Sequence, residues 1–204
     1  MNKKKTIAVA IVLALILLIG GMLAFYTDTD SADNVFTLGK NIDIELNEQW
    51  DAVAGQNILP GAVVPKAPKI TNNENSSEAY VFAKVIIPAY YKNGDTKTPM
   101  FTFTPNSGWI ELSAGKEVGE TYEYVYAYGV GSSLTKLAVN TTTSTAVFSE
   151  VVLDKTITKN DAVPTDDHKI IKVEAYGIQT ANLTDNGGNE VSAPAAVYAL
   201  FGNN

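Results

Sequence analysis

Apolar and polar residues alternate with a period of two along most of the chain, which is the pattern of half-buried β-strands. Ile42, Ile44 and Leu46 alternate with polar neighbours, whereas residues 79–87 are mostly apolar on both faces. The second segment therefore predicts a central strand, which we expect Pro88 to end. Similar patterns predict further strands at residues 101–104, 109–112, 122–130, 145–153 and 169–179.

Turn-forming residues separate these segments, and one helical segment follows them. Turns or loops are expected at Pro60-Gly61, Asn93-Gly94, 106–108 and 185–188. Residues 193–201 predict a short helix, with Pro194 suited to its first turn and Gly202 to its end. About eight to ten short strands predict an all-β fold, a jelly-roll-like antiparallel β-sandwich with a short C-terminal helix, in preference to an immunoglobulin-like arrangement.

The first residues have the pattern of a secretory signal. Three lysines precede an unbroken apolar run at residues 7–19, and Gly20-Gly21 and Ala24 follow it. We expect a cleaved signal helix at residues 1–24, with the cut between Ala24 and Phe25. The alternative is a retained membrane anchor, because the uncharged stretch is long enough to span a bilayer, for which about 20 residues suffice.

Composition narrows the classes of partner. The chain has no cysteine, so neither a disulfide framework nor a thiolate metal site is expected. All fifteen basic residues are lysines, and the net charge is −7, which is the wrong sign for a nucleic-acid partner. Without residues 1–24 the chain keeps 12 lysines against 22 acidic residues, a formal charge of −10. Any assembly must overcome this repulsion, which salt screens.

The chain offers little for catalysis. His168 is the only histidine, whereas a hydrolytic zinc site takes two or three, and there is no G-x-S-x-G elbow. The aspartates at residues 28–33 and 161–167 lack the spacing of a calcium loop, so weak calcium binding is the lesser alternative to solvated acidic turns. We therefore predict no enzyme activity, no catalytic residue, no metal site and no cofactor.

Four tyrosines at alternate positions share one face of a predicted strand. This stripe is an aromatic platform for sugar or for a partner subunit, or else a core edge whose hydroxyls reach the rim. Because the residues on the opposite face of this strand are also apolar, the sequence does not determine which face points toward the core. The stripe consists of Tyr122, Tyr124, Tyr126 and Tyr128.

The segments GGMLAFYTDTDSADNVFTLGKNIDIELNE, ILPGAVVPKAPKITN and SSEAYVFAKVIIP carry a family resemblance, as does IIKVEAYGIQTANL near the end. Together they resemble the TasA/camelysin family of extracellular matrix proteins, which the signal peptidase SipW releases. The Gly-Gly-x-x-Ala junction before Phe25 is the most specific part. Residues 90–165 carry no motif of the family.

The resemblance implies a secreted jelly-roll subunit of biofilm matrix fibres on the cell surface of a Gram-positive-type bacterium. It also implies polymerisation by donor-strand exchange, in which residues 25–38 complete the sheet of the next copy of the domain at 39–204. Its expected partners are other copies of the chain, SipW during export and a minor assembly subunit; membrane contact is confined to the uncleaved signal. The donor residues are Phe25, Tyr26, Val35, Phe36 and Leu38.

Two alternatives to a fibre subunit remain open. A cell-surface module that binds glycan or protein would use the tyrosine stripe. The metallopeptidase activity attached to camelysin is the less favoured one, because a single histidine departs from any zinc-protease pattern.

Overall fold

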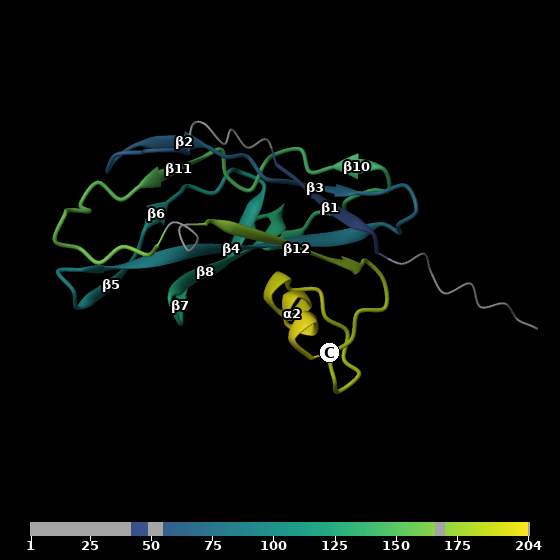
Figure 1. Ribbon diagram of the computed structural model, residues 1–204. Helices are drawn as coiled ribbons and strands as arrows, with labels where there is room; N and C mark the ends of the chain where they lie inside the picture. The colour runs from purple at the N-terminus through teal and green to yellow at the C-terminus, as the bar shows by residue number, and fades with distance from the viewer. Residues whose placement is uncertain (1–41, 49–54, 166–169, 204) are drawn as a thin grey trace, which may run out of the picture. The chain divides into compact units, whose positions relative to one another are not determined.

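The computed structural model describes residues 42–48, 55–165 and 170–203, which belong to one compact unit, Gly39–Asn204. This unit is an all-β sandwich of antiparallel strands with one short helix, as the sequence predicts (Figure 1). The predicted signal and its cleavage site, the donor segment and His168 lie outside the described residues.

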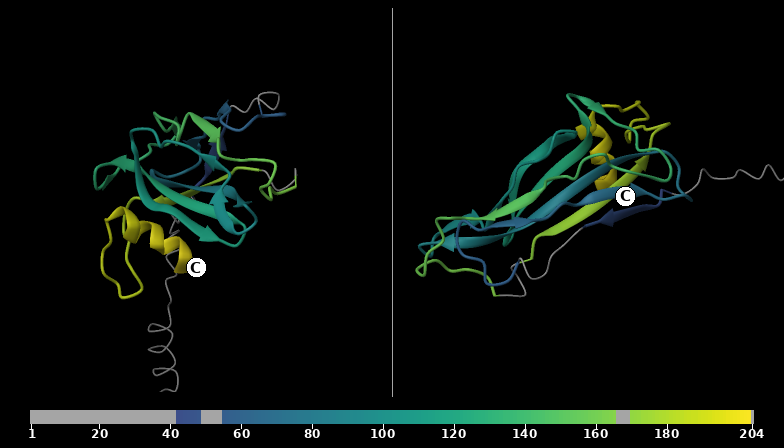
Figure 2. Two further views of the ribbon diagram at one scale, coloured as in Figure 1. Left: turned by 90° about the vertical axis from the view of Figure 1, so that its left-hand side faces the viewer. Right: turned by 90° about the horizontal axis from the view of Figure 1, so that it is seen from above.

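One layer of the sandwich is a sheet in the order β12-β4-β8-β7, with β5 added beside β4 and β9 beside β8. The central strand β4 is buried over most of its length and, with 14 residues, is longer than its neighbours β8, with 10, and β12, with 8. Figure 2 shows the long sheet from two further sides. The bounds are β4 (Ala79–Lys92), β5 (Thr96–Pro99), β7 (Trp109–Val118), β8 (Thr121–Val130), β9 (Ser133–Leu134) and β12 (Lys172–Gln179).

The other layer consists of two short sheets, in the orders β1-β3-β10 and β2-β11-β6. Each of their strands has four residues or fewer, so their cohesion depends on packing against the long sheet rather than on extended ladders. The bounds are β1 (Ile44–Asn47), β2 (Val63–Pro65), β3 (Lys69–Asn72), β6 (Phe101–Thr102), β10 (Thr141–Thr142) and β11 (Glu150–Leu153).

The main core lies between the two layers. Alternate residues of β4, from Ala79 to Ile87, face this core, together with Val64, Ile70 and Val151 of the opposite layer. Burial of these side chains is the main favourable contribution to folding.

A second cluster covers the outer face of the long sheet. Phe82 and Ala127 project from the sheet onto Val197 of the helix α2 (Pro194–Ala199). Pro194 begins this helix, as predicted. Gly202 does not end it, because the chain continues as a 3₁₀ turn, η2 (Leu200–Asn203).

The predicted end of the central strand at Pro88 is wrong, because β4 continues to Lys92. The β12 ladder ends at Ile86, and the β5 ladder begins at Ala89. Pro88 lies between them, where its carbonyl accepts from the Met100 amide at 2.8 Å. The missing N–H of proline therefore falls where one neighbouring strand replaces another, which makes it tolerable inside a strand.

The strand predicted at 145–153 is also shorter than expected, because only Glu150–Leu153 forms β11. The preceding residues are bonded singly: Val147 donates to Pro68 O at 2.9 Å and accepts from Asn106 N at 2.9 Å. The segments that pair with residues 147 and 148 contain Pro68 and Pro105, which lack the N–H that a continuous ladder requires. Val147 and Phe148 are nevertheless fully buried.

Candidate functional site

The two layers meet at an open seam, which has β12 on one side and β1 on the other (Figure 1). These strands are in contact but are not hydrogen-bonded as a ladder. Close packing at Gly177 holds them together: a Cβ placed there would lie 2.7 Å from Cγ2 of Ile42 and 3.1 Å from Cγ2 of Ile44. Glycine therefore permits the approach of β1 to the β12 edge.

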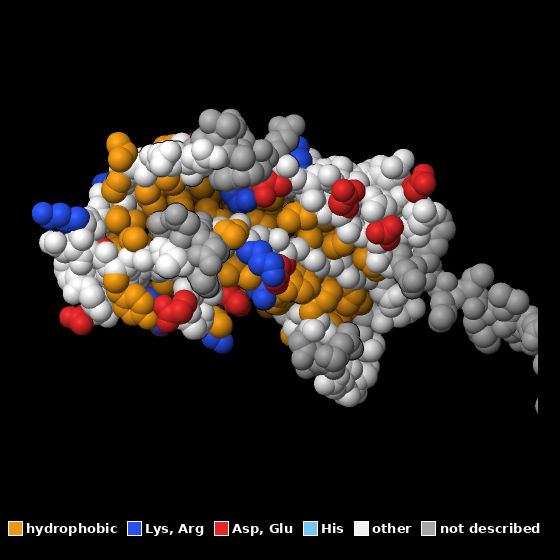
Figure 3. All heavy atoms as spheres, viewed as in Figure 1, with side chains coloured by type: hydrophobic (Ala, Val, Ile, Leu, Met, Phe, Trp, Pro, Cys, Tyr) orange, Lys and Arg blue, Asp and Glu red, His pale blue; other side chains and the backbone are white. Residues whose placement is uncertain are grey.

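An apolar depression, here called the seam groove, continues the seam away from Gly177. It has a cavity of about 220 Å³, and its lining side chains come from both layers. Ile170, at its mouth, is 65% exposed. Figure 3 shows hydrophobic side chains exposed along the face between the layers. The apolar lining residues are Ile58, Val64, Phe101, Val151, Ile170 and Ile171.

A buried lysine lies in the wall of the seam groove. Lys66 is 6% exposed, and its Nζ lies 2.5 Å from Oε1 of Glu48. Glu48 directly follows β1 and Lys66 directly follows β2, so the ion pair ties the two short sheets together beside the groove. A charge buried among apolar side chains is tolerable only when it is paired in this way.

The outer edge of β12 has unpaired main-chain groups. The Ala89 amide donates to Glu120 O on the side of β8, whereas the Pro88 carbonyl accepts on the opposite side. The main-chain N–H and C=O groups of the even-numbered residues of β4 therefore point toward β12. Their partners in β12 are also even-numbered. By alternation, the N–H and C=O groups of Val173 and Ala175 point away from β4. Among the described residues, no strand pairs with this edge.

The opposite edge of the same sheet is built differently. The pairing of β7 with β8 shifts register twice, between Glu111 and Ser113 and again between Ser113 and Lys116. Gly115, with φ of 85°, lies in the second irregularity, and charged residues follow it. Bulges and charges of this kind protect an edge from pairing, whereas β12 keeps its register over all eight residues.

The tyrosine stripe on β8 faces the core, not solvent. Tyr126 and Tyr128 are 2% and 8% exposed, and Tyr124 packs against the main core. Two of the hydroxyls reach polar partners at the rim: that of Tyr128 lies 2.9 Å from Ser144 Oγ, and that of Tyr126 donates to Glu111 Oε2 at 3.4 Å. Burial raises the pKa of Tyr126. The aromatic-platform interpretation is therefore wrong for these rings, which form a core edge.

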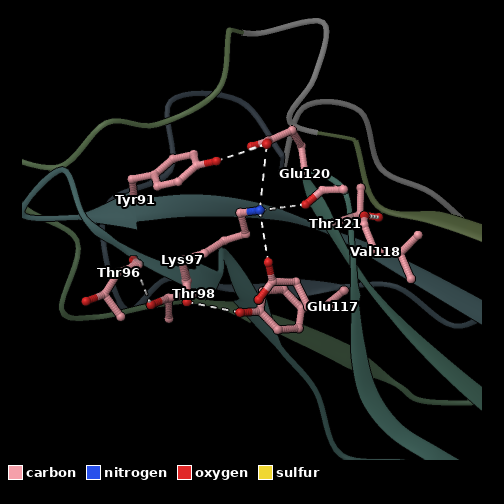
Figure 4. Close-up of polar contacts among 10 residues, drawn as sticks. Tyr91, Thr96, Lys97, Thr98, Glu117, Val118, Glu120 and Thr121 are labelled. Carbon is pink, nitrogen blue, oxygen red and sulfur yellow. Dashed lines mark hydrogen bonds and ion pairs between the residues drawn. The ribbon is translucent and has the colours of Figure 1, made fainter.

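Lys97, whose carbonyl oxygen is bonded by Tyr122 at the end of the stripe, lies at the centre of a polar cluster with Glu117 and Glu120 (Figure 4). The hydroxyl of Tyr122 donates to Lys97 O at 3.0 Å. Lys97 Nζ contacts Glu117 at 3.0 Å and Gly119 O at 2.7 Å, and the hydrogen bond with Glu117 raises the pKa of Lys97. This cluster joins β5 to the β7–β8 turn and serves the fold.

Within the described ranges, no three His, Cys, Asp or Glu residues come close enough to hold a metal ion. In the same ranges, no helix is both long and apolar enough to cross a lipid bilayer.

Sequence reasoning did not identify the seam groove. Its lining comes from segments as far apart as Ile58 and Ile171, which only the register of the sheets brings together. The adjacent apolar pairs Val63-Val64 and Ile170-Ile171 are the one local signal, since one member of each pair is exposed.

The comparisons with known proteins give one match. Residues 1–100 match the family model described as camelysin metallo-endopeptidase. No curated protein and no solved structure matches the chain. The matched segment contains the Gly-Gly junction, β1, β2, β3 and β4, and with them the buried Lys66 and one face of the seam. Over its first 100 residues, the chain thus belongs to the TasA/camelysin family.

Proposed function

We propose that this chain, after removal of residues 1–24, is a secreted structural subunit of extracellular biofilm matrix fibres in a Gram-positive-type bacterium. Its copies join by donor-strand exchange, in which residues 25–38 of one copy add to the sheet edge of the next. Family membership and the signal-like pattern before Phe25 support secretion through SipW. A minor assembly subunit is a further expected partner.

The observation that carries the proposal is the regular edge of β12 beside the seam groove, an edge with which no described strand pairs. An added strand would bond to the outward main-chain groups of Val173 and Ala175 and place its alternate side chains in the groove. This is recognition by β-augmentation, in which main-chain bonds give affinity and pockets give selectivity. A regular edge that lacks the protection seen on β7 suits this use.

The donor segment has apolar side chains on both faces of an added strand. Phe36 and Leu38 share one face and Phe25 and Val35 the other, so one pair would enter the groove and the other would pack against the neighbouring subunit's surface. Burial of all four contributes roughly 6–12 kcal/mol at about 1.5–3 kcal/mol each. Four ladder bonds to Val173 and Ala175 add about 2–6 kcal/mol. Ordering about twelve residues costs on the order of 12 kcal/mol in backbone entropy. These terms nearly balance, so assembly should depend on concentration and should need the other contacts between subunits.

We propose a structural role and not a peptidase activity, although the family model carries a metallo-endopeptidase description. The sequence has one histidine and no cysteine, which is too few nitrogen and sulfur ligands for the usual zinc-protease site. Incubation of the purified chain with casein, with and without a chelator, tests this. Chelator-sensitive cleavage would contradict the structural proposal.

Electron microscopy of two purified chains tests the fibre proposal. The chain that begins at Phe25 should form filaments, whereas the chain that begins at Gly39 should remain a folded monomer. Circular dichroism of both chains controls for folding. Filaments from the shorter chain would contradict donor-strand exchange, and a monomeric longer chain at high salt and millimolar concentration would contradict the fibre role.

A further inference from the structure

A second pocket lies at the C-terminal end of the unit, between the end of β12, the loop that follows it and η2. Its volume is about 500 Å³, within the range of small-molecule sites. The pocket combines exposed polar side chains with a partly buried apolar floor. It shares no lining residue with the seam groove.

The polar side chains of this pocket are all uncharged amides or hydroxyls. They are Gln179, Asn182, Thr184 and Asn186, and each is exposed. None of these four side chains makes a hydrogen bond within the described part of the chain. Amide and hydroxyl groups together offer both donors and acceptors, which is what a ligand rich in hydroxyls requires. No lysine, aspartate or glutamate lines the pocket.

The floor offers a flat apolar surface. Leu183 is buried, and Leu200 and Phe201 are partly exposed beside it. The Phe201 ring is held by three aromatic neighbours, with centroids 5.6 Å from Phe82, 5.4 Å from Tyr176 and 5.8 Å from Tyr198. A sugar ring has an apolar C–H face and a rim of hydroxyls, so a fixed aromatic side chain with amides around it matches both of its surfaces.

The loop that carries three of the polar residues is already ordered by its own hydrogen bonds. Asp185 Oδ1 accepts from Gly187 N at 2.8 Å and from Asn189 N at 2.9 Å. Val191 N donates to Leu183 O at 3.0 Å, which closes the loop. The Asp185 carboxylate is therefore used within the loop, and ligand binding would cost little ordering entropy.

We propose that this pocket binds a neutral carbohydrate, in the size range of one or two sugar units. Its uncharged lining disfavours anionic glycans, since the protein as a whole is strongly negative. Binding is independent of the seam groove, so it can hold or fail whether or not the chain forms fibres. In a fibre subunit it would attach the fibre to a polysaccharide.

The proposal is tested by probing an array of neutral and uronate-containing oligosaccharides with the chain that begins at Phe25. Calorimetry then measures the affinity of this chain for the neutral sugar that binds best. The decisive variant is Asn182→Gly, with Asn140→Gly as its matched control. Both asparagines are exposed with left-handed backbone, at φ of 56° and 57°, so glycine is tolerated at both.

We expect binding of a neutral sugar that persists in 1 M NaCl, a loss of at least tenfold in affinity for Asn182→Gly and no change for Asn140→Gly. Thr184→Val should weaken binding in the same direction. Three results would overturn the proposal: no neutral sugar bound at millimolar concentration, binding only of charged sugars, or equal affinity of the two glycine variants. Filament formation, measured in parallel, should not differ between the variants.

Discussion

Glu174, on the outer face of the long sheet, links the stability of the fold to pH. Its carboxylate pairs with Lys172 at 2.6 Å and Lys84 at 3.1 Å, and it accepts from the Tyr176 hydroxyl at 2.7 Å. The hydrogen bond with Lys172 is the largest contribution that lowers the pKa of Glu174, which falls to about 2. The ionised carboxylate therefore stabilises the folded state over a defined pH range.

Because the folded-state pKa lies below the ordinary value, this stability is present above about pH 4.5 and is lost as the pH falls towards 2. We expect Glu174→Gln to lower the free energy of unfolding by up to about 1 kcal/mol at pH 7 and to have almost no effect near pH 2. Urea unfolding across this range measures it, with Glu150→Gln, an exposed glutamate on β11, as the control. A cost independent of pH would contradict this role.

Glu48 has a different role, because its partner Lys66 is buried in the wall of the seam groove. Removal of one member of a buried pair leaves a poorly compensated charge and typically costs 3–5 kcal/mol. Glu48 is itself partly exposed. We therefore expect a smaller cost, about 2 kcal/mol, for Glu48→Gln in chemical denaturation.

Glu45→Gln is the matched control for this variant. Glu45 is a neighbouring glutamate on β1 that is exposed, so it should change the free energy of unfolding by less than about 0.5 kcal/mol. Equal effects of the two substitutions would show that the pair with Lys66 contributes nothing to the join between β1 and β2.

At the scale of the elements, the sequence predicts a strand where an apolar run is long. Because residues 79–87 are mostly apolar on both faces, the pattern alone does not say which face lies toward the main core. The existence of β4 as a central strand was predictable. The full length of β4 was not, because the effect of Pro88 depends on which strand is its neighbour. The inward side of the tyrosine stripe was also undetermined, since tyrosine fits a core edge as well as a surface.

The shortest strands were mostly beyond local prediction. Strands β9 and β10 have two residues each, and their conformation follows from partners in other parts of the chain. The seam groove and the C-terminal pocket have the same origin, because their linings combine residues that are distant in sequence. The donor segment, in contrast, was inferred from family resemblance and not from alternation.

A substitution at Gly177 tests how closely β1 and β12 must approach each other. An alanine methyl at this position would collide with Ile42 and Ile44, so we expect Gly177→Ala to lower the free energy of unfolding by about 1–3 kcal/mol. A double-mutant cycle with Ile42→Ala measures the coupling, because that change removes the closest atom. Additive costs would show that the collision is relieved elsewhere and that the seam is not tightly packed.

At the scale of the whole molecule, the described unit has two unequal sheet edges and an excess of negative charge. One edge is interrupted by bulges, whereas the other is regular and lies beside an apolar groove. The charge opposes association at low ionic strength, so screening should promote assembly. Under the proposed donor-strand exchange, we expect such a chain to associate only when a donor segment is supplied.

A mixing experiment with two variants tests donor-strand exchange most directly. The first is the chain that begins at Phe25 with Ala175→Pro, which keeps the donor but lacks an outward N–H at the acceptor edge. The second begins at Gly39, so it keeps the acceptor but lacks the donor. Light scattering after size-exclusion chromatography should show each as a monomer alone and a one-to-one dimer in the mixture. Two monomers in the mixture, or filaments of the proline variant alone, would contradict the account.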